Sequence, residues 1–383
     1  MKKLIALVLA MMLLVPALAM AEDVVKIGVF EPASGSNGAG GKQETLGVQY
    51  ANYMNPTVVI NGTEYKVELV IADNGSDDAK APSAAQNIIS AGASIALGSY
   101  GSSVSKAGSK TFKDADVPVI GLTCTNPQVT AGNSHYFRVC FLDPFQGTVL
   151  ANYAFKELGV KTAYCLGELG NDYDQGLINY FKEAFEALGG TVIAEPFPAD
   201  TQDFTSYLNN SAAYGAEVFF CPVSVKYATA IIQQASSQGL EIPVLGGDTL
   251  DNNMVAEAAK GTNVKVIITT FYQEGANKEF DDGFKAWLNA NPEMLTNNGG
   301  NDVISAVSVM GYDGYMMALA ALQSAGTTDS AAVMAALPTT EIDGISGHIK
   351  FDETGDAIRT AAFVKKINNE SGEWEFVAEQ TVE

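Results

Sequence analysis

Short apolar runs rich in valine, isoleucine and phenylalanine alternate with helical patterns along most of this chain, and this alternation limits the possible folds more than any other feature. The first series of runs spans Val24 to Phe30, Val67 to Ala72, Ser94 to Gly98 and Val117 to Leu122. Between the second and third runs, apolar residues recur at i, i+3, i+4, i+7 and i+8, which is typical of a helix packed on a sheet. Such alternation predicts parallel sheets with right-handed crossovers and helices on both faces.

A second series of the same kind begins after Pro144. Its apolar runs are TAYCLGE, TVIAE, EVFFC, IPVLGG and VKVIITT, with helical patterns between them. One parallel sheet does not need this many strands, so we predict an α/β fold with two Rossmann-like lobes, each a parallel sheet flanked by helices. No low-complexity linker separates the two series. A hinge that the chain crosses several times explains this absence better than a single tether.

The C-terminal part of the chain returns toward the first lobe. Helical patterns cover Asn277 to Asn291 and Val303 to Leu322. The segment that follows reads as strands joined by polar turns, with turn signals at Gly355-Asp356 and Ser371-Gly372.

The N-terminus has the parts of a secretory signal peptide. Two lysines precede an apolar run from Leu4 to Leu14, and Ala19 and Ala21 flank a cut before Glu22. We therefore predict a signal peptide at residues 1–21 and a mature protein that is periplasmic or otherwise extracytoplasmic. The competing interpretation is an N-terminal anchor that stays attached. No later segment approaches the roughly 20 apolar residues of a membrane helix.

Charge and length restrict the partners. The formal net charge of −22 argues against nucleic acid and anionic membranes as partners, because both require a basic surface. With 383 residues, 47% of them hydrophobic, the chain can bury the cores of two domains. The four cysteines are expected to be small core residues, and spacing leaves any pairing among them open: Cys124, Cys140, Cys165 and Cys221.

The stretch FEPASGSNGAGGKQE, residues 30–44, raises the question of a phosphate-binding loop. A Walker loop needs glycine five residues before Gly41 and serine or threonine after Lys42, but Ser36 and Gln43 stand at these positions. A dinucleotide fingerprint that starts at Gly38 would need its third glycine at the position of Gln43. Both nucleotide interpretations therefore fail.

Catalytic and metal-binding patterns are also missing. His135 and His348 are far apart in the sequence, with no ligand partners at metal-site spacing, and no G-x-S-x-G elbow exists. We expect no metal, no cofactor and no enzymatic activity.

Small polar residues follow several predicted strands, and ligands of open parallel sheets bind outside such strand ends. GSYGSSVSK supplies Tyr100 and Ser102, with backbone N–H groups where the next helix opens, and this arrangement can receive a carboxylate. GLTCTNP supplies Thr123 and Thr125. In the second series, GNDYDQG and GGDTLD occupy equivalent positions and supply the side chains of Tyr173 and Asp248.

Each of these candidates also has a purely structural interpretation. Ser102 could cap a helix, Thr125 could stabilise a turn, and Tyr173 could pack between lobes. Asp248 could cap the helix near Asn253. Taken singly, these interpretations are favoured, and the joint placement at strand ends argues for a binding site.

With these motifs in order along almost the whole mature chain, the sequence resembles the branched-chain amino-acid binding proteins of ABC transporters, which have the type I periplasmic binding fold. The likeness rests on KIGVFEPASGSNGAGGKQETLGVQYA, GSYGSSVSKAG, TCTNPQVT, YDQGL, GGD and GISGHIKFDETGD. It implies a receptor that captures an amino acid, most simply Leu, Ile or Val, closes around it, and delivers it to the permease.

The resemblance also implies roles for the candidates. Ser102 and the backbone at Thr123 would bind the ligand carboxylate, and Thr125 would contact both carboxylate and ammonium. Asp248 would bind the ammonium group, and Tyr173 would close over the ligand from the second lobe.

Two departures from the family pattern matter. An aromatic cover from the first glycine loop is replaced by Gly40, which is expected to leave the side-chain pocket open, and a cysteine pair is replaced by Ser76 and Gly101. The glycine stretch then resembles a lip of the cleft, where backbone and ligand approach closely. Under this interpretation, Lys42 and Gln43 begin the helix.

The resemblance implies lobe boundaries as well. The N-terminal lobe would comprise residues 22–142 and 271–349, and the C-terminal lobe residues 143–270 and 350–383. The hinge would be crossed near Leu142-Asp143, Phe271-Tyr272 and Lys350-Phe351. We expect a monomer that binds a small amino acid, with ABC transporter permease subunits as partners. The alternatives are an aromatic acid, an amide or a short peptide in the same fold, or a secreted enzyme that uses the same cleft.

Overall fold

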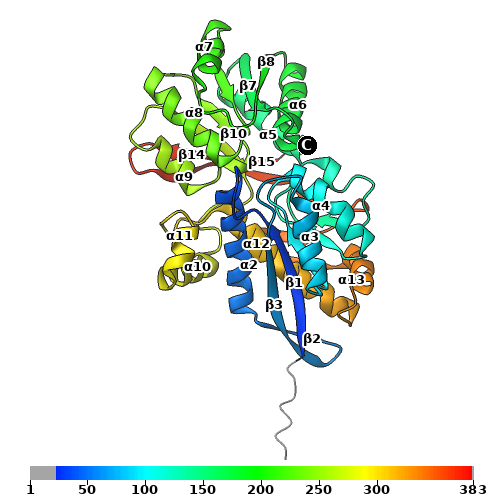
Figure 1. Ribbon diagram of the computed structural model, residues 1–383. Helices are drawn as coiled ribbons and strands as arrows, with labels where there is room; N and C mark the ends of the chain where they lie inside the picture. Colours follow the sequence, from blue (N-terminus) through cyan, green and yellow to red (C-terminus); the bar gives the residue numbers. More distant parts are fainter. Residues whose placement is uncertain (1–22, 382–383) are drawn as a thin grey trace, which may run out of the picture.

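The computed structural model describes residues 23–381, so the predicted signal peptide, residues 1–21, lies outside the described residues. Figure 1 shows two α/β lobes, one above the other, each with a sheet flanked by helices. We call the lower lobe in Figure 1 the first lobe and the upper one the second lobe. The predicted fold class is confirmed.

The first lobe is built on a sheet that has six strands within the described residues. They are β1 (Val24–Glu31), β2 (Thr57–Ile60), β3 (Thr63–Asp73), β4 (Ile95–Gly98), β5 (Val119–Gly121) and β6 (Tyr136–Arg138). Their spatial order is β2-β3-β1-β4-β5-β6, and every neighbouring pair is parallel except the β2–β3 hairpin. The four apolar runs of the first series correspond to β1, β3, β4 and β5, as predicted.

Helices from both ends of the sequence flank this sheet (Figure 1). They are α2 (Gly38–Met54), α3 (Ala81–Ser90), α4 (Ser102–Asp114), α10 (Lys278–Ala290), α11 (Pro292–Asn297), α12 (Ala306–Ala325) and α13 (Ser330–Ala336). Helices α2 and α12 pack closely, because a Cβ at Gly47 would lie 1.8 Å from the carbonyl oxygen of Ser308. Helix α12, from the C-terminal part of the chain, is thus held to the first lobe by its close contact with α2.

Helix α2 begins at Gly38, four residues before the predicted start at Lys42. A Cβ at Gly41 would lie 2.3 Å from the carbonyl oxygen of Pro32, so the first turn passes Pro32 only because this position has no side chain. Glycine has a low helix propensity, but the close packing of this segment stabilises the helix despite its glycines.

The second lobe is built on a sheet in the order β15-β14-β11-β10-β9-β7-β8. Its strands are β7 (Thr162–Glu168), β8 (Thr191–Phe197), β9 (Val218–Phe220), β10 (Val244–Gly246), β11 (Val266–Thr270), β14 (Ala361–Asn368) and β15 (Glu373–Thr381). The strands of the second series, β7 to β11, pair in parallel, whereas β14 and β15 add two antiparallel strands at one edge.

The helices of the second lobe cover both faces of its sheet and include one π-helical segment, η2. They are α5 (Asp143–Asn152), η2 (Tyr153–Glu157), α6 (Asp172–Ala187), α7 (Thr205–Ala213), α8 (Val225–Gln238), the 3₁₀ turn η3 (Asp248–Leu250) and α9 (Asn253–Ala259). The remaining short elements are η1 (Pro127–Val129), η4 (Leu337–Thr339) and a hairpin of β12 (Glu341–Gly344) with β13 (Gly347–Lys350). All four cysteines are buried and free.

Buried contacts tie together the segments that run between the lobes. Arg138 Nε donates to Asp356 Oδ1 at 2.6 Å, and Arg359 Nε donates to the carbonyl of Val139 at 3.0 Å. The predicted lobe boundaries and the three hinge crossings remain predictions.

Candidate functional site

A cleft of about 710 Å³ is lined by loops of both sheets. On one side are the loops after β1, β3 and β4, and on the other the loops after β7, β8, β9 and β10. All of these loops follow the carboxyl ends of strands, which is where open α/β sheets bind ligands. Of the predicted site residues, Tyr100, Ser102 and Tyr173 line the cleft directly.

Ser102 is the first residue of α4, and Gly101 occupies the N-cap position. The interpretation of Ser102 as the cap is therefore wrong. Its side chain is buried, and its hydroxyl accepts a hydrogen bond from the backbone N–H of Asn126 at 3.3 Å. The start of a helix of 13 residues faces this part of the cleft, so its unpaired N–H groups can bind an anion.

Thr123 and Thr125 follow β5 and are buried behind the cleft lining. The hydroxyl of Thr123 donates to Glu44 Oε1 at 2.7 Å. The hydroxyl of Thr125 has no hydrogen-bond partner among residues 23–381, and the nearby turn is stabilised instead by Asn126, whose side chain accepts from Gln128 N. Thr125 is thus a buried hydroxyl that acts on the carboxyl group of Asp143 and lowers its pKa without making a well-formed hydrogen bond to it.

Asp248 is 1% exposed and lies at the start of η3. Its Oδ1 accepts hydrogen bonds from Gln146 Nε2 at 2.8 Å and from the Tyr173 hydroxyl at 2.9 Å. The cap of α9 is Asn252, which accepts from Met254 N, so the interpretation of Asp248 as that cap is wrong. Burial raises the pKa of Asp248 to about 6, and the two hydrogen bonds oppose this rise.

No cation of the described residues pairs with Asp248. The buried lysine and arginine of the described residues are already engaged: Lys365 binds Asp251 at 3.0 Å and Arg138 binds Asp356 at 2.6 Å. A buried carboxylate without a cationic partner is costly. Asp248 is not among the residues that line the cleft, but Tyr173, which hydrogen-bonds to it, lines the cleft directly.

Tyr100 overturns one expectation for the pocket. A Cβ at Gly40 would lie 2.4 Å from Cζ of the Tyr100 ring, so this ring fills the space over the glycine. The Tyr100 hydroxyl donates to the carbonyl oxygen of Thr249 at 3.1 Å, across to the second lobe. The expectation that Gly40 leaves an open pocket is thus wrong, because an aromatic side chain from the loop after β4 occupies that space.

The loops at the glycine stretch are held together by hydrogen bonds. Ser76 Oγ donates to the carbonyl of Ser34 at 2.8 Å and accepts from Asn37 N at 3.0 Å. Asp73 accepts from Ala33 N at 2.8 Å, and these bonds help to hold its pKa below the ordinary value despite partial burial. These loops border the cleft and include Gly35 and Asn37.

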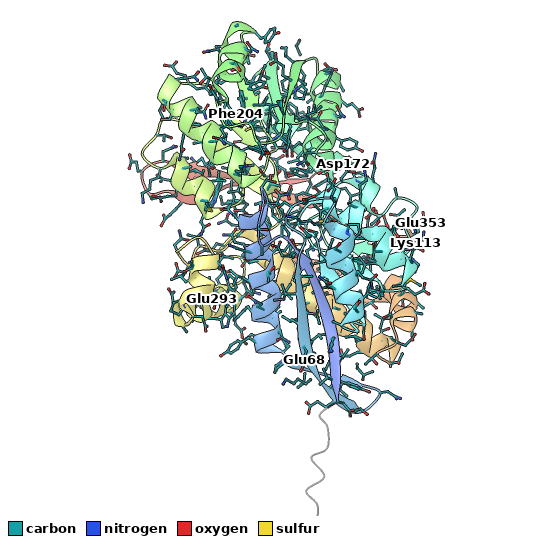
Figure 2. All side chains as sticks on the ribbon, in the orientation of Figure 1. Glu68, Lys113, Asp172, Phe204, Glu293 and Glu353 are labelled. Carbon is teal, nitrogen blue, oxygen red and sulfur yellow. The ribbon has the colours of Figure 1, made fainter. Side chains whose placement is uncertain are left out.

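Polar contacts bridge the two lobes on both sides of the cleft. Lys106 Nζ binds Asp172 Oδ2 at 2.7 Å, and Ser103 Oγ accepts from Asp172 N at 2.9 Å. Figure 2 shows Asp172 at the junction of the lobes. Elsewhere at the junction, Asn252 Nδ2 donates to Gln43 Oε1 at 2.6 Å. The structure therefore shows the lobes in contact around the cleft.

Sequence reasoning missed several buried polar residues beside the site: Glu31, Glu44, Asp143, Gln146, Ser224 and Thr249. The hydroxyl of Ser224 lines the cleft and has no partner among the described residues. Burial raises the pKa of Asp143 to about 8. One signal was available for Glu44, which falls at helical spacing with buried Gly40, Gly41 and Val48. Within residues 23–381, no group of His, Cys, Asp or Glu could hold a metal ion.

This arrangement defines a class of protein: a two-lobed α/β binding protein whose ligand cleft lies at the strand ends of both sheets. The chain belongs to the periplasmic binding protein family, whose model matches residues 24–372. No helix in the described part of the chain is long and apolar enough to cross a membrane.

Curated relatives are similar over nearly the whole chain. Leu/Ile/Val-binding protein homolog 3 of Brucella melitensis is 30% identical over 342 residues, which cover 87% of this chain and 88% of the relative. The leucine-, isoleucine-, valine-, threonine- and alanine-binding protein of Pseudomonas aeruginosa is 25% identical over 343 residues, covering 88% of each chain.

Solved structures give the same result. A leucine-binding protein of Thermotoga maritima matches with a TM-score of 0.81 and 30% identity, covering 94% of this chain and 99% of that chain. A solute-binding protein from R. palustris in complex with 4-hydroxybenzoate matches with a TM-score of 0.78 and 20% identity, covering 94% of this chain and 97% of that chain. The second likeness concerns the fold alone.

Proposed function

We propose that this protein is the extracytoplasmic solute-binding component of an ABC transporter and that it captures an amino acid in the cleft. The observation that carries the proposal is the pairing of two opposite features. The start of α4 with Ser102 suits a carboxylate, and Asp248 suits an ammonium group. A free amino acid carries both groups.

The proposed contacts follow from this polarity. Ser102 and the backbone N–H groups at the start of α4 hold the carboxylate, together with the backbone at Thr123. The buried hydroxyl of Thr125 hydrogen-bonds the ligand head group. Asp248, oriented by Gln146 and Tyr173, holds the ammonium. Tyr100 and Gly40 shape the inner wall of the pocket.

Branched-chain amino acids are the first ligands to test, because relatives across the whole chain are named for Leu, Ile and Val. A second candidate is an aromatic acid, which binds to a protein of the same fold. Asp248 argues against it, since an aromatic acid offers no ammonium group to a buried carboxylate. A secreted enzyme is the third alternative, and the relatives are solute-binding proteins.

The remaining parts of the proposal concern delivery. The protein acts as a monomer outside the cytoplasm after removal of residues 1–21, and its liganded form is presented to permease subunits. It performs no chemistry on the solute. Opening and closing of the lobes around the cleft admits and retains the ligand, and ligand favours closure by as much as it prefers the closed state.

A thermal-shift panel tests the proposal. L-leucine, L-isoleucine and L-valine are compared with L-phenylalanine, leucinamide, 4-hydroxybenzoate and a dipeptide. A ligand at 100 times its Kd adds about 2.7 kcal/mol to the free energy of unfolding, so a true ligand gives a clear rise in Tm. A shift with 4-hydroxybenzoate and none with any amino acid would select the second candidate. Turnover of a bound solute by the purified protein would favour an enzyme.

A further inference from the structure

Two acidic side chains lie buried in the first lobe. Glu31 ends β1 and Glu44 lies on the buried face of α2, and their exposed fractions are 1% and 0%. The titratable groups that act on them are Asp248, Cys124, Tyr100 and Tyr136. None of these groups is cationic, and neither carboxyl group forms an ion pair within the described residues.

Each of the two carboxyl groups holds a residue of the candidate site. Glu31 Oε2 accepts a hydrogen bond from the backbone N–H of Tyr100 at 2.8 Å. Glu44 Oε1 accepts from the hydroxyl of Thr123 at 2.7 Å. The strand-end loops after β4 and β5 are therefore both anchored to this acid pair.

The other oxygens of the pair require a proton. Glu31 Oε1 and Glu44 Oε2 are buried and have no hydrogen-bond donor among residues 23–381. The two carboxyl groups lie close enough for each to affect the pKa of the other. An ionised carboxylate can only accept hydrogen bonds, so a proton on one of the two acids would supply the donor that this pair lacks.

The backbone leaves room for this arrangement at one glycine. A Cβ at Gly98 would lie 2.3 Å from Glu31 Oε1, and the φ of Gly98 is +111°, which disfavours any other residue. The end of β4 is thus shaped around the Glu31 carboxyl group.

We propose that Glu31 and Glu44 are positioning residues that share one proton, and that this shared proton keeps Tyr100 and Thr123 in the arrangement that binds the ligand. The inference rests on the proposed function, because Tyr100 and Thr123 act on an amino acid in the same cleft. Loss of the proton leaves two adjacent buried negative charges, which repel each other. The end of β1 and helix α2 then separate, and both anchored loops move.

The ionisation of the pair sets the pH range of this effect. Burial raises the pKa of Glu44 to about 8, with a smaller contribution from the charge of Asp248. Burial and the neighbouring Glu44 raise the pKa of Glu31 well above its ordinary value. The pair therefore keeps its proton at neutral pH, and ligand affinity falls once the pH rises above about 8.

The test uses three variants of the full mature protein and L-leucine as the probe. In Glu31→Gln, the amide N–H replaces the shared proton and the amide oxygen still accepts from Tyr100 N. Glu31→Ala removes both bonds. Glu68→Gln is the matched control, since Glu68 is exposed on β3 and Figure 2 shows it at the end of the first lobe remote from the junction.

Isothermal titration from pH 6.5 to about 8.8, below the range in which the ammonium group of L-leucine itself deprotonates, should show an alkaline loss of affinity in the wild type and in Glu68→Gln. Glu31→Gln should lose the alkaline fall, because its amide does not ionise. Glu31→Ala should bind about tenfold more weakly at neutral pH, because Tyr100 N–H is left buried without an acceptor. A flat wild-type profile, or an alkaline fall retained in Glu31→Gln, overturns the proposal.

Two measurements without ligand separate this inference from the proposed function. The infrared carbonyl band of a protonated carboxyl group at pH 7 should be weaker in Glu31→Gln than in the wild type. The fall in Tm between pH 7 and pH 9 should be larger in the wild type than in the variant. If L-leucine binds at no pH, the branched-chain assignment fails. Equal infrared bands and equal Tm profiles in the wild type and in Glu31→Gln would then overturn the shared proton of the acid pair as well.

Discussion

Asp248 in the second lobe and the Glu31–Glu44 pair in the first lobe are equally hidden from water, yet they hold protons differently. Burial raises the pKa of Asp248 to about 6 and that of Glu44 to about 8. Asp248 accepts hydrogen bonds from Gln146 and Tyr173. Glu44 accepts one from Thr123 and faces a second acid.

The difference follows from the hydrogen-bond donors that each carboxyl group meets. Donors stabilise the charged form and oppose the effect of burial at Asp248 and at Glu44, whereas the neighbouring Glu44 adds to the effect of burial on the pKa of Glu31. At neutral pH, Asp248 is therefore available as a negative group for a ligand ammonium, and the Glu31–Glu44 pair retains a proton. One buried acid site is suited to bind charge, and the other to hold loops in place.

The largest expected effect comes from removing the charge of Asp248. In Asp248→Asn, ligand affinity should fall by about thirtyfold to several thousandfold, since truncating one partner of a buried charge pair costs about 2–5 kcal/mol. The amide keeps the size of the side chain, so the Tm of the unliganded protein should change little. Titration calorimetry and a melting curve measure the two quantities.

The matched control for this variant is Asp329→Ala. Asp329 caps α13 and accepts from Ala332 N, so its loss should lower stability by about 1 kcal/mol and leave affinity unchanged. Unchanged affinity in Asp248→Asn would remove Asp248 from the site, and with it the main reason to regard the ligand as an amino acid.

The next effect concerns Tyr100, whose backbone binds Glu31 and whose hydroxyl reaches Thr249 beside Asp248. Gly40→Ala places a methyl group against this ring, so it should lower the free energy of unfolding by about 1–3 kcal/mol and weaken ligand binding. Gly132→Ala, with nothing within 4 Å of its Cβ, controls for the loss of a glycine, although its φ of +70° adds strain.

Shortening Tyr100 should relieve the collision. The double variant Gly40→Ala with Tyr100→Leu should recover part of the stability lost in Gly40→Ala and should also accept larger side chains, such as that of L-phenylalanine. If Gly40→Ala is as stable as the wild type, the Tyr100 ring does not fill this space in solution.

The pH dependence separates stability from affinity. Glu44, Asp143 and Asp248 all have folded-state pKa values raised by burial, to about 8, 8 and 6. The folded state then binds more protons than the unfolded state, so the stability from these groups is greatest at low pH and is lost as the pH rises through the folded-state values. The Tm of the unliganded protein should be higher at pH 6 than at pH 8.5.

Affinity for an amino acid should change in the opposite direction on the acid side. Protonation of Asp248 below pH 6 removes the charge that holds the ammonium, so affinity should fall about tenfold between pH 6 and pH 5. In Asp248→Asn this acid loss should disappear. An acid loss of equal size in that variant would assign the effect to another group.

The fold was predictable because its signals are local. Apolar periodicity and β-branched runs marked β1, β3, β7 and β11 within a few residues, and alternation of strands and helices gave the parallel sheets. Strand-end positions followed from topology, which is why Tyr100, Ser102 and Tyr173 could be expected near a cleft that they now line.

The missing parts of the candidate site depend on distances between remote segments. Glu31 and Glu44 are 13 positions apart, in a strand and a helix whose approach no periodicity gives, and Gln146 meets Asp248 across 102 positions. The same reason explains the error at Gly40. An absent side chain indicates space at that position, but which neighbour fills the space is decided by packing.

The smallest expected effect lies at the rim of the cleft, where charges are exposed and the contrast with the buried acids should be clear. Lys106 on α4 binds Asp172 across the lobes at 2.7 Å, and the two side chains are 30% and 39% exposed. Pairs of this kind contribute about 0.2–1 kcal/mol and are screened by salt. Lys106→Met should therefore weaken ligand binding by less than about fivefold, through poorer closure, and the difference from the wild type should shrink at high salt.

Affinity measured at low and high sodium chloride checks this prediction. The control is Lys113→Met on the same helix, and Figure 2 shows Lys113 away from Asp172. A loss as large as that of Asp248→Asn, persisting at high salt, would mean that Lys106 contacts the ligand itself and that the bound solute carries more negative charge than an amino acid with an aliphatic side chain.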